Sequence, residues 1–243
     1  MNLETMLFSQ GFGSRRQCRA LIIRGALRID GQVHDDPGAL WASDATTFDM
    51  EGTVWRYRAK AYLMLHKPPA YECSRAPQHH ASVFSLLPPQ MLERGLQCVG
   101  RLDQDTTGLL LLSDDGQFIH QLASPKRHVP KIYQAVVRHA LDETQLASLR
   151  TGVLLHGESM PTRALAADMQ DTHLLALTID EGKYHQVKRM VAAAGNRVEH
   201  LHRTAIGGMT LPATLAPGQW QWLEAEDLAA LQDVSPPAAA RST

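Results

Sequence analysis

The segment from Gly100 to Gly108 reads GRLDQDTTG and gathers the residue types of this chain that are best suited to chemistry. It holds the carboxylates of Asp103 and Asp105 and the guanidinium of Arg101, directly before an apolar run, LLLL, at 109–112. A buried apolar run would hold this polar loop on a rigid edge of a core, where functional side chains commonly lie. The residues alone allow a carboxylate nucleophile, a pair of acids as in glycoside hydrolases, or a structural Arg–Asp bridge.

Short apolar runs predict the elements that position this loop. Residues 61–65 (AYLML) predict a buried strand that ends at Lys67-Pro68-Pro69, since proline cannot donate to a sheet. The run at 109–112 predicts a second buried strand. Between loop and strand, Thr106 and Thr107 are expected to bond the local backbone through their hydroxyls.

A basic helix is predicted near the N-terminus. Ser14 is an N-cap with Gln17 as its capping-box partner, and residues 18, 21 and 22 form an apolar stripe that ends at Gly25. On this helix Arg15, Arg16 and Arg19 occupy a sector about 100° wide beside the stripe. A hairpin with its turn at Asp30-Gly31 follows. We expect a loop over 44–52 and a linker over 55–58.

The net charge hides a local asymmetry. The whole chain has 24 basic and 25 acidic residues, a formal charge of -1, which does not by itself indicate a nucleic-acid partner. Residues 1–28 nevertheless contain five arginines and one glutamate, and further basic stretches lie at 121–139 and 181–203. Three separate basic segments could form one surface that follows a phosphate backbone.

Composition excludes several other classes of protein. Three scattered cysteines suit neither a disulfide framework nor a zinc site, and the pair His79-His80 lacks further ligands at short spacing. Neither a signal peptide nor a membrane-spanning apolar run is visible. We therefore expect a cytoplasmic protein that does not bind membranes, with a disordered tail over 234–243.

The N-terminal pattern GSRRQCRALIIRGALRIDGQV resembles the S4 RNA-binding domain, over roughly residues 1–50. Arginine forks on a rigid helix match the phosphate oxygens of structured RNA. The family usually has basic residues on its first helix, whereas residues 2–6 here contain none. The resemblance therefore assigns RNA binding mainly to Arg15, Arg16 and Arg19.

The loop at 100–116, GRLDQDTTGLLLLSDDG, resembles the signature loop of pseudouridine synthases of the RsuA/RluA superfamily, in the form of the RsuA branch. Other family segments follow in the expected order, from about residue 61 to about 230. They are YLMLHKPPAYECS, SPKRHVPKIYQAVV, DEGKYHQVKRMVAAAGNRVEHLHRTAIGGMTL and LAPGQWQWL. The first departs from the family in having His66 where Asn is usual.

The resemblance implies three catalytic residues. Asp103 would be the carboxylate that acts while the N1–C1′ bond of uridine breaks and the base is rejoined through C5. Tyr133 would stack on the flipped-out uracil. Lys188 would lie beside Asp103 and favour its ionised form.

Three more residues are implied to hold the RNA. Arg101 would enter the base stack or hold a phosphate when the uridine is extruded, and Lys131 would meet phosphate. Leu201 is a candidate for apolar packing against the base or Tyr133.

These observations predict an α+β fold: an S4-like RNA-binding module with linker over 1–58, then a catalytic domain over 59–233 with a mixed, mostly antiparallel sheet. The resemblance implies isomerisation of a specific uridine in 16S ribosomal RNA, free or in a small-subunit assembly intermediate. Large-subunit (23S) RNA is the alternative substrate, and a non-catalytic assembly factor or a glycoside hydrolase the alternative class. Isomerisation involves no net redox change, so we expect no cofactor and no metal. We also expect a monomer.

Overall fold

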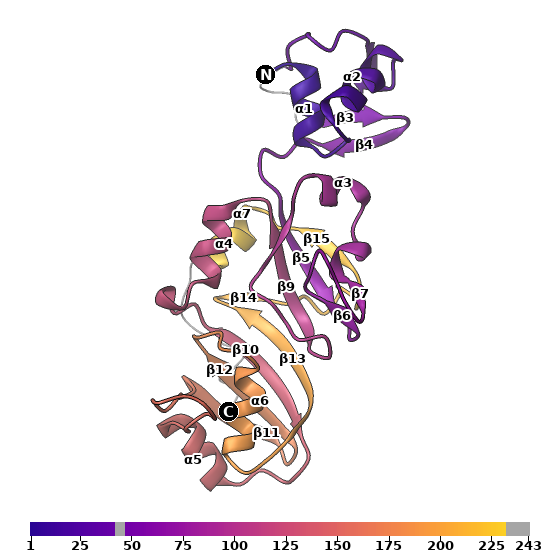
Figure 1. Ribbon diagram of the computed structural model, residues 1–243. Helices are drawn as coiled ribbons and strands as arrows, with labels where there is room; N and C mark the ends of the chain where they lie inside the picture. Colours follow the sequence, from indigo (N-terminus) through magenta and orange to yellow (C-terminus); the bar gives the residue numbers. More distant parts are fainter. Residues whose placement is uncertain (42–46, 232–243) are drawn as a thin grey trace. The chain divides into compact units, whose positions relative to one another are not determined.

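The computed structural model describes residues 1–41 and 47–231, which form two compact units (Figure 1). The first unit combines Met1–Ala61 with Phe84–Gln97, and the second combines Tyr62–Val83 with the chain from Cys98 onward. The predicted tail at 234–243 and the first part of the loop expected at 44–52 lie outside the described residues. Within the described ranges, none of the helices is long and apolar enough to cross a membrane.

The first unit packs two helices against a four-stranded sheet of order β2-β1-β3-β4. Its elements are α1 (Leu3–Ser9), α2 (Arg15–Ile23), β1 (Leu27–Ile29), β2 (Gln32–His34), β3 (Thr47–Met50), β4 (Thr53–Arg56), η1 (Val83–Leu86, a 3-10 helix across the boundary) and α3 (Pro89–Glu93).

The predicted basic helix and hairpin are confirmed. The side chains and backbones of Ser14 and Gln17 form the capping box of α2, and Gly25 follows its end in a left-handed conformation. Residues 30 and 31 both have positive φ, as the two-residue hairpin turn between β1 and β2 requires. Cys18 and Ile22 are fully buried, so the apolar stripe of α2 faces the core of the unit.

The expected linker over 55–58 is wrong in its first half. Residues 53–56 form strand β4, which pairs with β3 at 47–50, within the expected loop. The ring of Trp55 packs edge-on against Phe12 with 5.1 Å between ring centroids, which ties this strand to the core. Composition suggested a linker because a four-residue strand with an exposed face carries little apolar periodicity.

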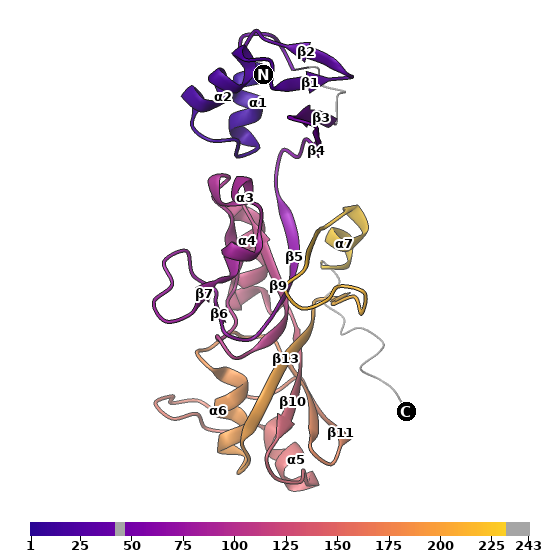
Figure 2. The same ribbon diagram turned by 90° about the vertical axis from the view of Figure 1, so that its right-hand side faces the viewer.

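The second unit contains a nine-stranded sheet whose main path has the order β11-β12-β10-β13-β9-β5-β15 (Figures 1 and 2). Its elements are β5 (Tyr62–Lys67), β6 (Tyr71–Glu72), β7 (Ala81–Ser82), β8 (Gln97–Val99), β9 (Thr107–Ser113), α4 (Gly116–Ala123), η2 (Pro125–Arg127), β10 (Lys131–Val137), α5 (Glu143–Thr151), β11 (Ala166–Asp171), β12 (Leu174–Ile179), α6 (Gln186–Ala193), β13 (Val198–Ile206), β14 (Met209–Thr210), β15 (Trp220–Trp222) and α7 (Ala225–Ala230).

Both predicted buried strands are present as β5 and β9, and they pair antiparallel with each other. All four leucines of β9, at 109–112, have no exposed surface, so this strand is covered on both faces. The β13–β9 pair is parallel, whereas the other neighbouring strands along the main path pair antiparallel. The fold is therefore α+β with a mixed, mostly antiparallel sheet, as predicted.

The parallel pair depends on a glycine. Gly108 lies opposite Arg203 and has a φ of +104°, a backbone conformation that side chains with a Cβ rarely adopt. A Cβ at this position would lie 2.2 Å from the carbonyl oxygen of Arg203. The absence of a side chain at 108 therefore lets β9 and β13 approach, directly behind the loop that carries Asp103.

Candidate active site

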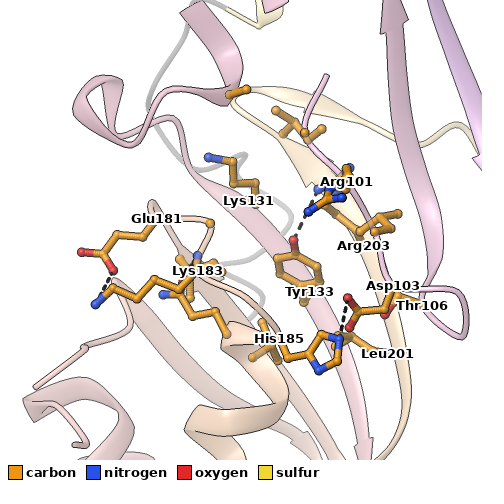
Figure 3. A pocket seen from close by; sticks show the side chains of 18 of the residues that line it. Arg101, Asp103, Thr106, Lys131, Tyr133, Glu181, Lys183, His185, Leu201 and Arg203 are labelled. Carbon is orange, nitrogen blue, oxygen red and sulfur yellow. Dashed lines mark hydrogen bonds and ion pairs between the residues drawn. The ribbon is translucent and has the colours of Figure 1, made fainter. Parts of the chain in front are cut away.

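A cavity of about 140 Å³ lies in the second unit, where one face of β10 and β13 meets the loop at 100–106 and the segment at 179–188 (Figure 3). Apolar side chains line part of it, and charged side chains surround the rest. Six of the residues that the sequence singles out line it together: Arg101, Asp103, Lys131, Tyr133, Lys188 and Leu201.

The carboxylate of Asp103 lies between two nitrogen groups from the segment that begins α6. Its Oδ2 is 3.0 Å from Nζ of Lys188, and its Oδ1 is 3.3 Å from Nε2 of His185. The Asp103 side chain is 26% exposed, so a substrate in the cavity can reach it. The predicted neighbourhood of Asp103 and Lys188 is thus present.

Lys188 also binds a second carboxylate. Its Nζ donates to Oδ1 of Asp105 at 2.6 Å. Partial burial opposes the charge on Lys188, but hydrogen bonds from Nζ to Asp105 and Asp103 outweigh it and raise the pKa of Lys188. Burial likewise disfavours the Asp105 carboxylate, yet the hydrogen bond and charge of Lys188 lower its pKa. The ammonium and Asp105 are therefore both ionised at neutral pH.

His185 reaches Asp103 because its backbone takes a rare conformation. It has a φ of +48° as the residue before α6, although a non-glycine residue avoids this region. The ring of Tyr184 stacks on the imidazole with 3.8 Å between centroids. Strained backbone of this kind concentrates at functional sites, and here it turns the imidazole toward the carboxylate.

A buried lysine holds the loop that carries Asp103. Lys67, at the end of β5, has no exposed surface, and its Nζ donates to the carbonyl oxygens of Pro68, Gln104 and Thr106 at 2.9–3.1 Å. Burial lowers the pKa of this ammonium. Because two of the three carbonyls flank Asp103 and Asp105, Lys67 fixes the backbone on which the carboxylates stand.

We predict that Lys67→Met destabilises the protein by about 3 kcal/mol, because the carbonyl oxygens of Pro68 and Thr106 lose their donor, whereas that of Gln104 keeps the backbone N–H of Ala70. Urea unfolding measures the change. Lys126→Met is the matched control, since Lys126 is exposed in the same unit, and it should shift stability by less than about 0.5 kcal/mol. Equal stabilities of the two variants would contradict this role of Lys67.

The register of the sheet brings Tyr133 and Arg203 together. They lie opposite each other on β10 and β13. Nη1 of Arg203 donates to the Tyr133 hydroxyl at 3.4 Å, and Nε donates to the carbonyl of Leu109 at 2.8 Å. Tyr133 is 8% and Leu201 7% exposed, and both border the cavity (Figure 3). An aromatic face and an apolar side chain are thus available to a planar ligand.

Lys131 and Arg101 border the same cavity from different depths. Lys131 is 9% exposed and shares a strand face with Tyr133, two residues along β10. Burial, aided by the charge of Arg203, lowers the pKa of Lys131 to about 8. Arg101 is exposed.

The three arginines predicted to bind RNA lie in the other unit. Arg15, Arg16 and Arg19 are exposed on α2. The carboxylate of Glu4, on α1, lies 2.9 Å from Arg19 and 3.7 Å from Arg15. The first helix therefore contributes an acid that partly offsets this basic row.

The sequence analysis did not single out two cavity residues, and its expectation for the hydroxyls of Thr106 and Thr107 was wrong. Arg203 and His185 were noted only as parts of longer motifs. The hydroxyl of Thr107 contacts His202 at 2.8 Å and donates to the carbonyl of Leu201 on β13, rather than bonding the local backbone. The Thr106 hydroxyl is buried without a hydrogen-bond partner among the described residues. The loop is held from neighbouring strands, a relation that local spacing cannot indicate.

The remaining histidines of interest lie away from the cavity lining. His66, where the family usually has Asn, contacts the carbonyl of Leu215 through Nδ1 at 2.7 Å. The backbone N–H groups of His79 and His80 donate to the carboxylate of Glu72. Across the described ranges, no three side chains among His, Cys, Asp and Glu are placed to hold a metal ion.

Two family models match the chain. The model described as RNA pseudouridylate synthase matches residues 61–193, and the S4 domain model matches residues 1–40. The first match includes the loop at 100–108, β10 and α6, and the second includes α1, α2 and the hairpin.

Similar proteins cover almost the whole chain. A ribosomal small subunit pseudouridine synthase A of Escherichia coli is 42% identical over 233 residues, 95% of this chain and all of that protein. An uncharacterized RNA pseudouridine synthase of Bacillus subtilis is 36% identical over 236 residues, 96% of this chain and 99% of its own length. A crystal structure of a pseudouridylate synthase, 32% identical, covers 97% of this chain and 100% of its own with a TM-score of 0.67.

Proposed function

This chain belongs to the RNA pseudouridylate synthase family, and we propose that it isomerises one uridine of 16S ribosomal RNA to pseudouridine. The observation that carries the proposal is the carboxylate of Asp103, 3.0 Å from an ammonium in a cavity with an aromatic wall. Such a cavity can take a base that has been turned out of its stack.

In the proposed reaction Asp103 acts on the flipped-out nucleotide. The N1–C1′ bond breaks, its electron pair stays with the uracil, and the base turns so that C5 can bond to C1′. The C5 proton then leaves and N1 takes up a proton, so product and substrate have the same atoms and oxidation state. An ionised carboxylate at this place can attack the sugar or the base, or accept a ribose proton.

Lys188 and His185 keep Asp103 in position and ready to react in this proposal. Lys188 places a positive charge 3.0 Å from one oxygen of the carboxylate, and His185 restrains the other oxygen at 3.3 Å. Because Lys188 also binds Asp105, its ammonium is held at two points and cannot turn away.

The walls of the cavity suit a uracil. We assign the face of Tyr133 to stacking and Leu201 to apolar contact. Both contacts orient the base whether it is neutral or anionic. Arg101, exposed beside the cavity, would take the place that the uridine leaves in the stack or hold its phosphate.

The choice of small-subunit RNA rests on the relatives and the N-terminal unit. Relatives at 36–42% identity are named for the ribosomal small subunit, and the S4 domain supplies an arginine row suited to structured RNA. Pseudouridine mapping of ribosomal RNA from a deletion strain tests the proposal. We expect one 16S position to lose its modification, and loss only from 23S RNA, or from neither, would refute it.

The N-terminal unit should contribute affinity that depends on salt. We predict that replacing Arg15, Arg16 and Arg19 with Ala weakens RNA binding and reduces the slope of log K against log salt by about 2, as phosphate contacts are lost. Glu4→Gln removes the acid that offsets Arg15 and Arg19, and it should not reduce the slope. Filter binding over a range of salt measures both. An unchanged slope in the triple variant would mean that RNA binds elsewhere.

A further inference from the structure

The closed end of the cavity carries two buried cations. Lys131 is 9% and Arg203 3% exposed, whereas the Asp103 side chain is 26% exposed. Figure 3 shows Lys131 and Arg203 on the side of the Tyr133 ring where its hydroxyl lies, and His185 on the opposite side. The cavity therefore has an acidic reacting centre at one end and a cationic end deeper in the protein.

Neither cation is neutralised by the part of the chain that the structure describes. Arg203 binds only the Leu109 carbonyl and the Tyr133 hydroxyl, and its Nη2 is buried without a partner there. Lys131 makes no hydrogen bond or ion pair within the described ranges. Burying a charge without a partner costs several kcal/mol, so a feature of this kind needs a functional reason.

The acids near Lys131 are bound by other residues. Asp180, directly after β12, partly opposes the lowering of the Lys131 pKa, but its Oδ2 lies 2.8 Å from Nδ1 of His128. Glu181 lies 3.3 Å from Nζ of Lys183, away from Lys131 in Figure 3. The thiols of Cys73 and Cys98 interact electrostatically with Arg203 but do not line the cavity. The other charged side chains of the lining are the carboxylate of Asp103 and cations such as Arg101, so the closed end of the cavity itself is positive.

A phosphate is a poor match for this end. Phosphate oxygens stay hydrated, whereas the apolar residues Ile179 and Ile206, which pair with Lys131 on β12 and β13, line the cavity beside it. A base that stacks on Tyr133 with its sugar at Asp103 would instead extend its carbonyl edge toward the closed end. The base becomes anionic when the N1–C1′ bond breaks, because it keeps the electron pair, which spreads onto its carbonyl oxygens.

We propose that Lys131 is a catalytic residue that donates to a carbonyl oxygen of the uracil and stabilises the negative charge of the detached base, with Arg203 adding positive charge behind Tyr133. This inference rests on the proposed uridine isomerisation and reassigns Lys131 from phosphate to base. Preorganised donors aimed at developing charge in a dry site are among the strongest catalytic devices in enzymes.

The decisive variants are Lys131→Met, which removes the charge and keeps the length, and Lys131→Arg, which keeps the charge. We expect Lys131→Met to lower kcat about 100-fold, as for loss of one oxyanion donor, with RNA affinity and its salt slope unchanged. Its melting temperature should rise, because an unpaired buried charge is removed. A lower RNA affinity with a salt slope reduced by about 1 and an unchanged kcat would identify a phosphate contact and overturn the proposal.

The pH profile provides a second readout. Lys131 carries its charge below its pKa of about 8 and loses it above, so kcat/KM of the wild type should fall as pH rises through 8. Lys131→Arg should retain part of the activity and extend the profile to higher pH, since guanidinium stays charged. Superimposable profiles of wild type and Lys131→Arg would contradict the proposal.

A binding experiment separates this inference from the RNA assignment. Barbiturate is a uracil analogue that is anionic at neutral pH, and 5,6-dihydrouracil is neutral. The wild type should bind barbiturate at least about tenfold more tightly, and Lys131→Met should lose that preference. Equal affinities of the wild type for the two probes would overturn the charge role, whatever RNA the enzyme modifies. A preference for barbiturate without turnover of either ribosomal RNA would instead count against the proposed function.

Discussion

Asp103→Asn lowers kcat by at least about 10³-fold, while RNA affinity stays equal to that of the wild type or tighter. The amide keeps the shape of the side chain but loses the negative charge that the proposed reaction requires. Lys188 keeps its contact with Asp105 at 2.6 Å, so the local packing survives the substitution. Single-turnover assays at saturating enzyme, together with filter binding, measure the two quantities separately.

Asp105→Asn is the matched control for this prediction. Asp105 stands two residues away and binds the same ammonium, but it does not line the cavity, and its side chain is 63% exposed. Loss of an exposed ion pair has a small effect, so we expect less than about a tenfold decrease in kcat. A non-catalytic assembly factor would show no turnover in the wild type or either variant. Comparable losses in both variants would favour the paired-acid chemistry of glycoside hydrolases.

Gly108→Ala should prevent the second unit from folding stably. The added Cβ would lie 2.2 Å from the carbonyl oxygen and 2.7 Å from the backbone nitrogen of Arg203, and neither can move without breaking the β9–β13 pair. The φ of +104° adds conformational strain. Together we expect a loss of more than about 4 kcal/mol, seen as insolubility or as a much lower urea midpoint.

Gly195→Ala separates strain from collision. Gly195 also has a positive φ, +85°, in the same unit, but a Cβ there meets nothing within 4 Å. We expect this control to lose only about 1 kcal/mol. If the two variants were equally stable, the close approach of β9 and β13 at Gly108 would have no energetic importance.

Features that depend on neighbours in sequence could be predicted. The capping box of α2, the hairpin turn at Asp30-Gly31 and the buried run at 109–112 all follow from spacings of a few residues. The grouping of Asp103, Tyr133 and Lys188 came from a resemblance over ordered motifs, because these residues are far apart in the chain. No periodicity in the sequence relates them.

Features that depend on register and on rare backbone could not be predicted. Arg203 faces Tyr133 only because β10 and β13 pair in that register, 70 residues apart. His185 reaches Asp103 only with a φ of +48°, and Lys67 binds carbonyls of the loop that carries Asp103, 37 and 39 residues further along. Such contacts depend on tertiary packing. The cationic end of the cavity, formed by Lys131 and Arg203, could therefore be identified only from the structure.

Tritium release tests the central claim most directly. Loss of the C5 proton accompanies uridine isomerisation, so RNA labelled with 5-tritiated uridine releases tritium to water as the reaction proceeds. The purified protein is given 16S RNA, 23S RNA and small-subunit assembly intermediates, with Asp103→Asn as the control. We predict release of one equivalent from a small-subunit substrate, with none from 23S RNA and none by the variant. Release from 23S RNA alone, or from no substrate, would contradict the account.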